Sequence, residues 1–315
     1  MTLADPAPRL PVARRRSPLA RLRAIREEQV LPYIYLTPAL LLLGIFVYWP
    51  LVYTIYLSFV DWNFVEETKT WVGLENYVGL YHSTLFNDAA YNSLIYVAAS
   101  IPLKVLLPIP IAVFIWTMPR RIGDVYKTIV FLPTLLSFVV VALAFSWLLN
   151  PFMGFFAEVL RPYGIRLPPI FTNADLAIWG VLGLSTWKVV GFNVLLYLAG
   201  LAAINRDYVE AMEIDGAGDW AIFRHLVWPL LTPTTFFVAI ATVILSLNQV
   251  FTPIDVLTQG GPSNSTTNFF YMVYQYAFVT FNVGFGSAGT VMLFALLILV
   301  TFLKAKAVEK RVHYQ

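Results

Sequence analysis

The side chains that could do chemistry in this sequence are concentrated in one polar segment and in two long apolar runs. The segment Tyr208–Pro229, with the residue before it, holds five carboxylates: Asp207, Glu210, Glu213, Asp215 and Asp219. The one fixed positive charge within the segment is Arg224. Cytoplasmic loops of membrane proteins are normally rich in Lys and Arg, so we interpret an acidic loop that folds as a surface for a partner protein.

The second group consists of polar side chains inside apolar runs, where ionisable groups are expensive and usually functional. The members are Lys188, Asn193 and Tyr197 in one run and Ser246, Asn248 and Gln249 in the next, ahead of Asp255. The first three follow at roughly one-turn spacings and are expected to share a helix face. Amides and phenols can bond the hydroxyls of a sugar or polyol, and a lysine suits a phosphate.

The alternative for these groups is hydrogen bonding between helices. For Asn193, Tyr197, Asn248 and Gln249 both interpretations stay open. For Lys188 the structural alternative is a salt bridge or a contact with a backbone carbonyl.

Several classes of catalytic site are excluded by the sequence. There is no cysteine, so disulfides and thiolate sites are absent. Neither G-x-x-x-x-G-K-[ST] nor H-E-x-x-H occurs, and the three histidines lie in different loops: His82, His225 and His313. We therefore expect no catalytic residue, no metal and no bound cofactor, and any uphill transport must draw on an ion gradient or another subunit.

The elements that must position these residues are predicted to be membrane-spanning helices. Of the 315 residues 59% are hydrophobic and 12% are charged, which a soluble domain of this length could not bury. A helix of about 20 residues crosses a bilayer, and six runs are long enough. The runs cover residues 34–60, 89–116, 126–149, 176–203, 230–257 and 283–303. The predicted class is an all-α polytopic membrane protein, and Pro102, Pro108 and Pro110 are expected to kink the second span.

The distribution of Lys and Arg predicts the orientation of the chain. Seven arginines lie between residues 9 and 26, and further basic residues lie around Arg120 and in the C-terminal tail. The opposite loops hold Lys69, Arg161 and Arg166. Both termini, the Arg120 loop and the Glu210 loop are therefore predicted to be cytoplasmic.

Three regions are predicted along the chain. Residues 1–32 form a cytoplasmic tail, of which 1–17 are expected to be disordered. Leu19, Leu22 and Ile25 recur at helical spacing, typical of an interfacial helix or of a plain solvated one. Residues 33–305 form the transmembrane domain, and 306–315 a second cytoplasmic tail.

Two segments are predicted on the outer side. The aromatic-rich Asp61–Asp88 and the turn Gly260-Gly261-Pro262 are candidates for contact with an external partner. The alternatives are interfacial anchoring for the first segment and simple chain reversal for the second.

The acidic loop, residues 204–229, is predicted to form a helix, a bend and a second helix. Glu210–Asp215 is helical, and Gly216 and Gly218 permit a sharp turn. Residues 220–228 then place Ile222, Phe223 and Leu226 on one face, and Pro229 suits the first turn of the next span.

This loop resembles the EAA motif of the permeases of binding-protein-dependent ABC importers. That motif runs E-A-A, three residues, G, nine residues, I-x-L-P, and this chain matches its spacing with Glu210-Ala211-Met212, Gly216 and Leu226-Val227-Trp228-Pro229. Met212, Leu226 and Trp228 replace Ala, Ile and Leu, and all three remain apolar.

Further matches resemble the carbohydrate branch of these permeases, which includes the maltose and glycerol-3-phosphate systems. They are Trp187-Lys188-x-x-Gly191-Phe192-Asn193, Ile214-Asp215-Gly216-Ala217-Gly218 and Thr258-Gln259-Gly260-Gly261-Pro262. The C-terminal Val308-Glu309-x-x-Val312-x-Tyr314-Gln315, with Ile254-Asp255 and Thr266-Thr267, is most similar to the glycerol-3-phosphate type.

The resemblance implies the type I ABC importer permease fold in an inner (cytoplasmic) membrane. It implies a second homologous permease, two ATP-binding subunits that hold ATP and Mg, an extracytoplasmic solute-binding protein and the lipid bilayer as partners, with no nucleic acid. The implied ATPase-coupling residues are Glu210, Ala211, Asp215, Gly216, Phe223, Leu226 and Pro229. The alternatives are an ion-coupled secondary transporter and a non-transporting scaffold.

Overall fold

The protein is described by a computed structural model, which defines the backbone of residues 18–309 and the side chains of residues 31–299. The predictions for the tail at 1–17, for Leu19, Leu22 and Ile25 as side chains, and for the similarity at 310–315 lie outside these described residues. The chain divides into two compact units, Met1–Thr54 and Ile55–Gln315.

The first unit is helical throughout its described part. Helix α1 (Pro18–Leu43) leads through a π-helical turn η1 (Gly44–Tyr48) into α2 (Trp49–Leu57), which enters the second unit. Within this stretch Leu31–Leu57 is apolar and long enough to cross a membrane. The helix that begins at Pro18 is thus continuous with the first predicted span and is not a separate short element.

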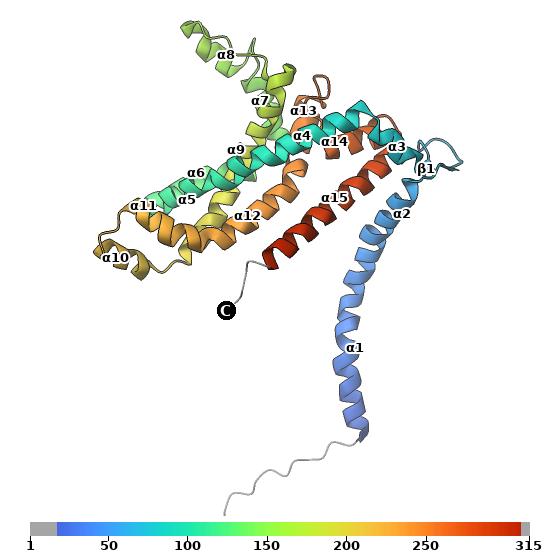
Figure 1. Ribbon diagram of the computed structural model, residues 1–315, viewed down its shortest axis with the longest axis horizontal. Helices are drawn as coiled ribbons and strands as arrows, with labels where there is room; N and C mark the ends of the chain where they lie inside the picture. Colours follow the sequence, from blue (N-terminus) through green and yellow to red (C-terminus); the bar gives the residue numbers. More distant parts are fainter. Residues whose placement is uncertain (1–17, 310–315) are drawn as a thin grey trace, which may run out of the picture. The chain divides into compact units, whose positions relative to one another are not determined.

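The second unit is built almost entirely of helices (Figure 1). After a two-stranded antiparallel ribbon, β1 (Val60–Asp61) with β2 (Thr70–Trp71), the main helices follow in chain order. They are α3 (Glu75–Tyr81), α4 (Thr84–Ser100), η2 (Ile101–Leu106), α5 (Pro108–Trp116), α6 (Arg120–Leu135), α7 (Phe138–Leu148), α8 (Phe155–Leu160), η3 (Arg161–Tyr163), η4 (Ile170–Thr172), α9 (Ala174–Ala202), α10 (Arg206–Ile214), α11 (Asp219–Ile222), η5 (Phe223–Val227), α12 (Trp228–Gln249), α13 (Phe251–Leu257), α14 (Phe269–Tyr274), η6 (Gln275–Val279) and α15 (Val283–Glu309). The predicted helical class is confirmed.

Four helical stretches in the described residues are long and apolar enough to span a membrane. They are Leu31–Leu57, Thr84–Trp116, Ala174–Ala202 and Asp219–Leu257. The apolar part of α15, Val283–Leu299, is shorter. Four of the six predicted spans therefore have full-length helices, and the count of six stays a prediction.

The expectation of one unbroken helix over residues 126–149 is wrong. Helices α6 and α7 meet at an angle of 96°. Pro133 lies in the last turn of α6, Leu136 is extended, and the Ser137 hydroxyl accepts from the Val139 N–H to start α7. The hydropathy of residues 126–149 indicates one apolar run. It contains no information about the proline that ends the first helix or the serine cap that begins the second.

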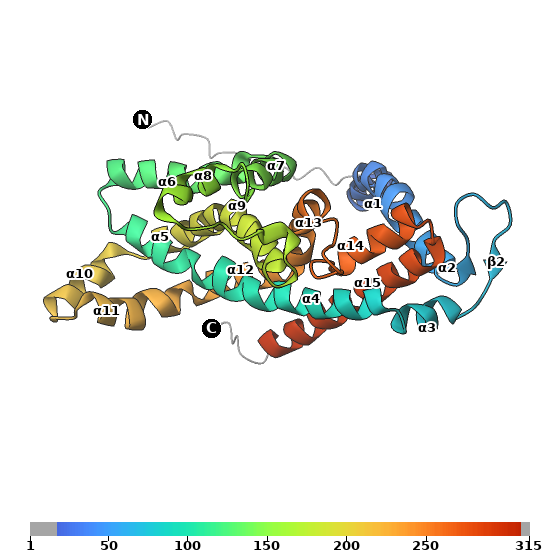
Figure 2. The same ribbon diagram turned by 90° about the horizontal axis from the view of Figure 1, so that it is seen from above.

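Helix α9 is the central element of the second unit. It packs against α5, α6 and α12, and Figure 2 shows it between α6 and α12. Its close approach to α6 occurs at Gly191, where a Cβ would collide with the Val130 carbonyl. Glycine at this position lets two helix backbones approach closely, as at many membrane-helix contacts.

The second predicted span changes helix type at its prolines. The chain runs from α4 through the π-helical η2 into α5, and the Leu107 N–H bonds the Pro102 carbonyl at 2.9 Å across the wider turn. Pro108 has no N–H for the carbonyl of Lys104, four residues earlier. The Asn193 side-chain amide of α9 supplies that missing donor at 2.6 Å.

Candidate functional sites

The acidic loop forms the predicted helix, bend and second helix. Asn205 caps α10, because its side-chain oxygen accepts from the Asp207 N–H at 3.1 Å. The helix ends at Ile214 with Asp215 as its C-cap, and Gly216 follows with a φ of 82°. The Ala217 N–H bonds the Met212 carbonyl at 2.9 Å and the Gly216 N–H bonds the Glu213 carbonyl at 3.0 Å. This pair of bonds is the Schellman motif, so the backbone itself fixes the bend.

The two sides of α10 face different surroundings. Val209 and Met212 are partly buried and pack, with Ile222 and Val227, on the apolar core that α5, α9 and α12 share. The opposite side carries four exposed residues at helical spacing, Asp207, Glu210, Ala211 and Ile214. We call these four residues the outer face of α10.

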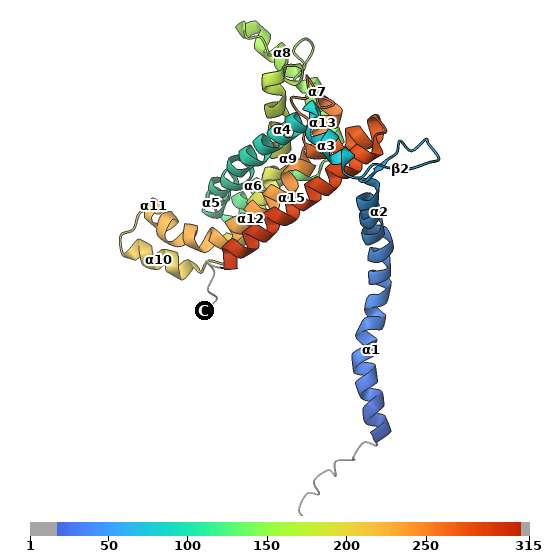
Figure 3. The same cartoon turned by 45° about the vertical axis from the view of Figure 1, so that its right-hand side comes forward.

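The outer face combines carboxylates with an exposed apolar side chain. Ile214 is 86% exposed, and the nearby Trp220 of α11 is 69% exposed while it stacks on Phe223 at 5.6 Å. Helices α10 and α11 protrude at one end of the helical bundle of the second unit (Figures 1 and 3). A protruding helix that exposes large apolar groups beside acids is typical of a docking surface.

A cavity of about 470 Å³ separates this helical pair from the end of α5. Its walls are largely apolar and include Val113, Trp116, Val209, Trp220 and Phe223. A smaller cavity of about 270 Å³ beside it is lined by Arg206, Glu210 and Glu213. The α10–α11 pair is therefore attached to its own subunit along one edge and leaves space for side chains from outside.

The predicted coupling residues fall into two groups by exposure. Glu210, Ala211, Asp215, Gly216 and Pro229 are exposed, whereas Phe223 and Leu226 are half-buried in the core under the loop. The first group is available to a partner. The second group packs beneath the loop and supports it. Pro229, from the first group, lies in the first turn of α12.

Lys188 lies at the bend between α6 and α7. Its ammonium donates to the Thr134 carbonyl at 3.1 Å and lies 4.3 Å from the ring centre of Phe138. The Thr134 hydroxyl donates back to the Lys188 carbonyl at 2.9 Å. The lysine thus supports the end of α6 through a carbonyl contact, which is one of the two structural alternatives named for it.

Lys188, Asn193 and Tyr197 do not share one face, contrary to the expectation. Residues five apart on an α-helix differ by about 140° in direction. Lys188 consequently contacts α6, while Asn193 contacts η2 and Tyr197 lies fully buried in the core formed with α5 and α12.

The polar residues of the next run also diverge. Ser246 is buried and donates to the Val243 carbonyl of its own helix at 3.2 Å. Asn248 is exposed. Gln249 points inward, and its side-chain oxygen accepts from the ammonium of Lys104 at 2.9 Å.

Lys104 is a polar residue that the sequence analysis missed. Its ammonium is fully buried and also donates to the Ser185 hydroxyl at 2.8 Å. An ionisable residue inside an apolar run between two prolines was the signal that could have identified it. The structure thus joins η2, α9 and α12 through Lys104, Ser185 and Gln249.

The loop that contains the turn Gly260–Pro262 is tied to helix α4 just after this turn. The Asn92 side-chain amide donates to the carbonyls of Asn264 and Thr267 at 2.8 and 3.0 Å. The Tyr96 hydroxyl donates to the Thr266 carbonyl at 3.2 Å. These contacts make the segment 258–268 a structural connection between α13 and α14, and contact of the Gly260-Gly261-Pro262 turn with an external partner stays a prediction.

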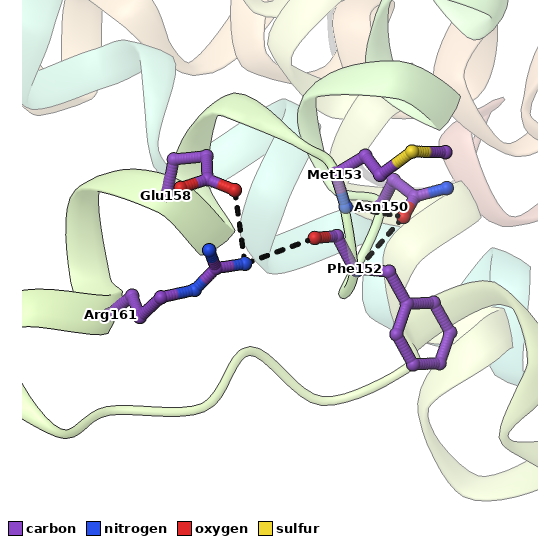
Figure 4. A network of polar contacts seen from close by, with 5 residues as sticks. All are labelled: Asn150, Phe152, Met153, Glu158 and Arg161. Atoms are coloured by element: carbon purple, nitrogen blue, oxygen red, sulfur yellow. Dashed lines mark hydrogen bonds and ion pairs between the residues drawn. The ribbon is translucent and has the colours of Figure 1, made fainter.

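The segment 150–173, which connects α7 to α9 and is called the hairpin below, presents three large apolar side chains on its surface. Phe152, Met153 and Tyr163 are each at least 74% exposed. Figure 4 shows Arg161, which donates to the Phe152 carbonyl at 3.2 Å and pairs with Glu158 at 3.0 Å. Arg161 and Arg166 also line a cavity of about 560 Å³, so the hairpin offers exposed apolar groups beside two cations.

Comparison with known proteins adds a family model. Residues 77–314 match the model described as "Binding-protein-dependent transport system inner membrane component". The sn-glycerol-3-phosphate transport system permease protein UgpA of Brucella abortus is 32% identical over 290 residues, which is 91% of this chain and 97% of that protein. The probable ABC transporter permease protein YurN of Bacillus subtilis is 31% identical over 267 residues, 84% of this chain and 91% of that protein.

Solved structures show the same fold. A bacterial ABC transporter involved in the import of the acidic polysaccharide alginate has a chain that matches with a TM-score of 0.77 and 24% identity, over 93% of this chain and 100% of that one. A second structure, of an alginate ABC transporter in complex with an alginate pentasaccharide-bound periplasmic protein, matches with a TM-score of 0.77 and 21% identity, over 90% of this chain and 95% of that one.

Proposed function

Given that this chain belongs to the inner membrane components of binding-protein-dependent transport systems, we propose that it is a permease subunit of an ATP-driven importer for carbohydrate-class solutes. The observation that carries the proposal is the folded α10–α11 pair, which protrudes with an acidic outer face at the position of the EAA motif. A permease of this family has no catalytic site of its own.

In the proposed topology the chain crosses the membrane six times with both termini in the cytoplasm. The bent pair α6–α7 and helix α15 are the two crossings beyond the four long helices. The proposal is supported by the excess of Lys and Arg near both termini and around Arg120. The α10–α11 pair is then cytoplasmic, and the hairpin 150–173 is extracytoplasmic.

The proposed partners follow from this arrangement. Two ATP-binding subunits hold ATP and Mg, and one of them receives the outer face of α10. A second homologous permease completes the pathway, and an extracytoplasmic binding protein delivers the solute. Closure of the ATPase subunits moves the two coupling helices together, and the permeases respond as rigid bodies with alternating access.

The hairpin 150–173 is the proposed contact for the binding protein. Exposed aromatic groups with neighbouring arginines are enriched in protein interfaces. Support comes from the exposure of Phe152, Met153 and Tyr163 beside Arg161. The Gly260–Pro262 turn and the segment Asp61–Asp88 stay secondary candidates for this contact.

The solute class is proposed from the relatives and from the polar residues of α9 and α12. Two of the proteins compared above are named for glycerol-3-phosphate and for alginate. The proposed pathway residues are Asn193, Tyr197, Ser246, Asn248 and Gln249, with Lys188 supporting the helix bend beside them.

Reversal of one charge on the outer face tests the coupling role. Glu210→Lys is expected to abolish uptake in cells while the protein stays in the membrane, because the exposed carboxylate no longer complements the ATPase surface. The matched control is Asp124→Lys, an exposed acidic position on α6 at the proposed cytoplasmic side and outside the acidic loop. Normal uptake by the Glu210 variant would refute coupling through this face.

An ion-coupled secondary transporter is the alternative that these findings do not favour. The matching family model describes a component of binding-protein-dependent transport systems, and the relatives compared above are named as permeases of a transport system or of an ABC transporter. Uptake that persists without an ATPase subunit and stops when the ion gradient is dissipated would restore this alternative.

A further inference from the structure

Lys104 is a buried cation whose observed partners are neutral. Its ammonium donates to the hydroxyl of Ser185 and to the side-chain oxygen of Gln249. Within the described part of the chain no carboxylate lies at ion-pair distance from it. A charged group in the membrane interior is costly unless it is paired, so an ammonium kept here without a counter-ion indicates a function.

The ammonium has hydrogen-bonding capacity left. A lysine ammonium has three N–H donors and no acceptor. The contacts with Ser185 and Gln249 use two of them. A phosphate or carboxylate oxygen would use the third donor and supply the missing negative charge.

The backbone is irregular where Lys104 lies. The residue is part of the π-helical segment η2, and its carbonyl is bonded by Asn193 because Pro108 cannot donate to it. Segments of π-helix inside α-helices are frequent at functional sites. Asn193 therefore fixes the backbone from which the Lys104 side chain extends.

The facing helix is also locally irregular at this level. Gln249 is the last residue of α12, and α13 begins after Val250 within the helical stretch Asp219–Leu257. Pro253 has no N–H for the Gln249 carbonyl. The ammonium of Lys104 therefore lies where two long helical stretches both depart from regular α-helical hydrogen bonding.

Gln249 is the partner of Lys104 that reaches the surface of the chain. Lys104 is fully buried, whereas Gln249 is partly exposed. A displacement of the Gln249 side chain would therefore expose the ammonium on the side where Gln249 lies.

We propose that Lys104 is the cation that recognises an anionic group, phosphate or carboxylate, on the transported solute. Gln249 and Ser185 hold the ammonium while the pathway is empty, and the anion of the solute replaces one of them during passage. The inference rests on the proposed transport function and narrows its substrates to anionic carbohydrates.

The test uses the complete transporter in proteoliposomes, with the second permease, the ATPase subunits and the binding protein of the same system. The probes are sn-glycerol-3-phosphate, a trisaccharide of uronic acids and neutral maltotriose. The variants are Lys104→Met, Lys104→Gln and Lys104→Arg. Lys127→Met is the matched control, because it removes a lysine that pairs with Asp124 at an exposed site.

The wild type is expected to take up at least one anionic probe. Lys104→Met and Lys104→Gln should lower that uptake by about tenfold or more, the worth of a hydrogen bond to a charged group. Lys104→Arg should retain most of it, and Lys127→Met should match the wild type. Binding-protein-stimulated ATP hydrolysis should persist in all four variants.

Two results would overturn the inference while leaving the proposed function intact. One is uptake of an anionic probe at the wild-type rate by Lys104→Gln. The other is uptake of the neutral probe alone by the wild type. If Lys104→Met does not assemble, the comparison of Lys104→Gln with Lys104→Arg decides. Absence of both uptake and stimulated ATP hydrolysis in the wild type would instead refute the proposed function, and the inference with it.

Discussion

At the scale of single residues, the acidic loop depends on a backbone conformation more than on a side chain. Gly216 has a φ of 82°, and no atom within 4 Å would oppose a Cβ there. The requirement for glycine is therefore conformational and not steric. The Schellman bonds that end α10 need this left-handed residue, and they set the direction in which α11 leaves.

Gly216→Ala is expected to weaken coupling. A left-handed backbone costs a residue with a Cβ about 1 to 2 kcal/mol, so the bend should loosen and stimulated ATP hydrolysis by the reconstituted complex should fall. Gly216→Asn should recover part of the activity, since Asn tolerates this region better.

The matched control for this prediction is Gly218→Ala. Gly218 has a φ of -79° and open space around it, so alanine fits without strain. Equal activities for the two alanine variants would contradict the role assigned to the left-handed turn.

At the scale of elements, helices α6 and α9 pack closely at a position that has no room for a side chain. A Cβ at Gly191 would meet the Val130 backbone, whereas Gly183 on the same helix has nothing within 4 Å. The structure therefore excludes a side chain at Gly191 and leaves room for one at Gly183, although both glycines lie inside one apolar helix.

Gly191→Ala is expected to lower the thermal stability of the purified protein. Overpacking of this kind typically costs about 1 to 3 kcal/mol, and here the obstacle is backbone, which cannot rotate away. Gly183→Ala should leave the melting temperature unchanged or raise it, because alanine has the higher helix propensity. Melting curves in detergent measure both, and a Gly191 variant as stable as the wild type would show that the helices separate easily.

The connection between α4 and the segment 258–268 can be tested in the same way. Asn92→Ala removes a side chain whose amide donates hydrogen bonds to the carbonyls of Asn264 and Thr267. A buried group that loses its partner costs about 1 to 3 kcal/mol, so the melting temperature should fall.

Asn87→Ala changes an exposed side chain on the same helix α4 and is the control. If both variants have the melting temperature of the wild type, the contacts of Asn92 do not stabilise the loop.

At the scale of the whole molecule, the function depends on which loops face the cytoplasm. The proposed topology separates the α10–α11 pair from the hairpin 150–173 by the length of α9, because the hairpin precedes this helix and α10 follows it. Coupling to an ATPase and contact with a binding protein are then served by opposite ends of one central helix.

Single cysteines can test this topology, since the natural sequence contains none. Glu67→Cys and Met153→Cys should react with a membrane-impermeant maleimide in spheroplasts with intact membranes. Thr117→Cys and Asp215→Cys should react only after permeabilisation. Labelling of the Asp215 position in intact spheroplasts would place the acidic loop outside and exclude its contact with a cytoplasmic ATPase.

The sequence by itself determined the helical membrane class and the helix, bend and helix of the acidic loop. Both follow from local properties: apolar length, and the spacing of acids, glycines and a proline over about twenty residues. The motif at Glu210 and Gly216 also indicated the family, because its spacing reflects a surface that is continuous in the chain.

The tertiary structure alone decided which polar residues meet. The apolar run at 126–149 turns by 96°, and Lys188 supports that turn through Thr134. Lys104 lies 81 residues from Ser185 and 145 from Gln249 in sequence, yet it bonds both. Hydropathy and spacing describe one helix at a time, whereas the face that a residue presents to distant helices depends on how those helices pack, and this packing brings the buried ammonium to the break at the end of α12.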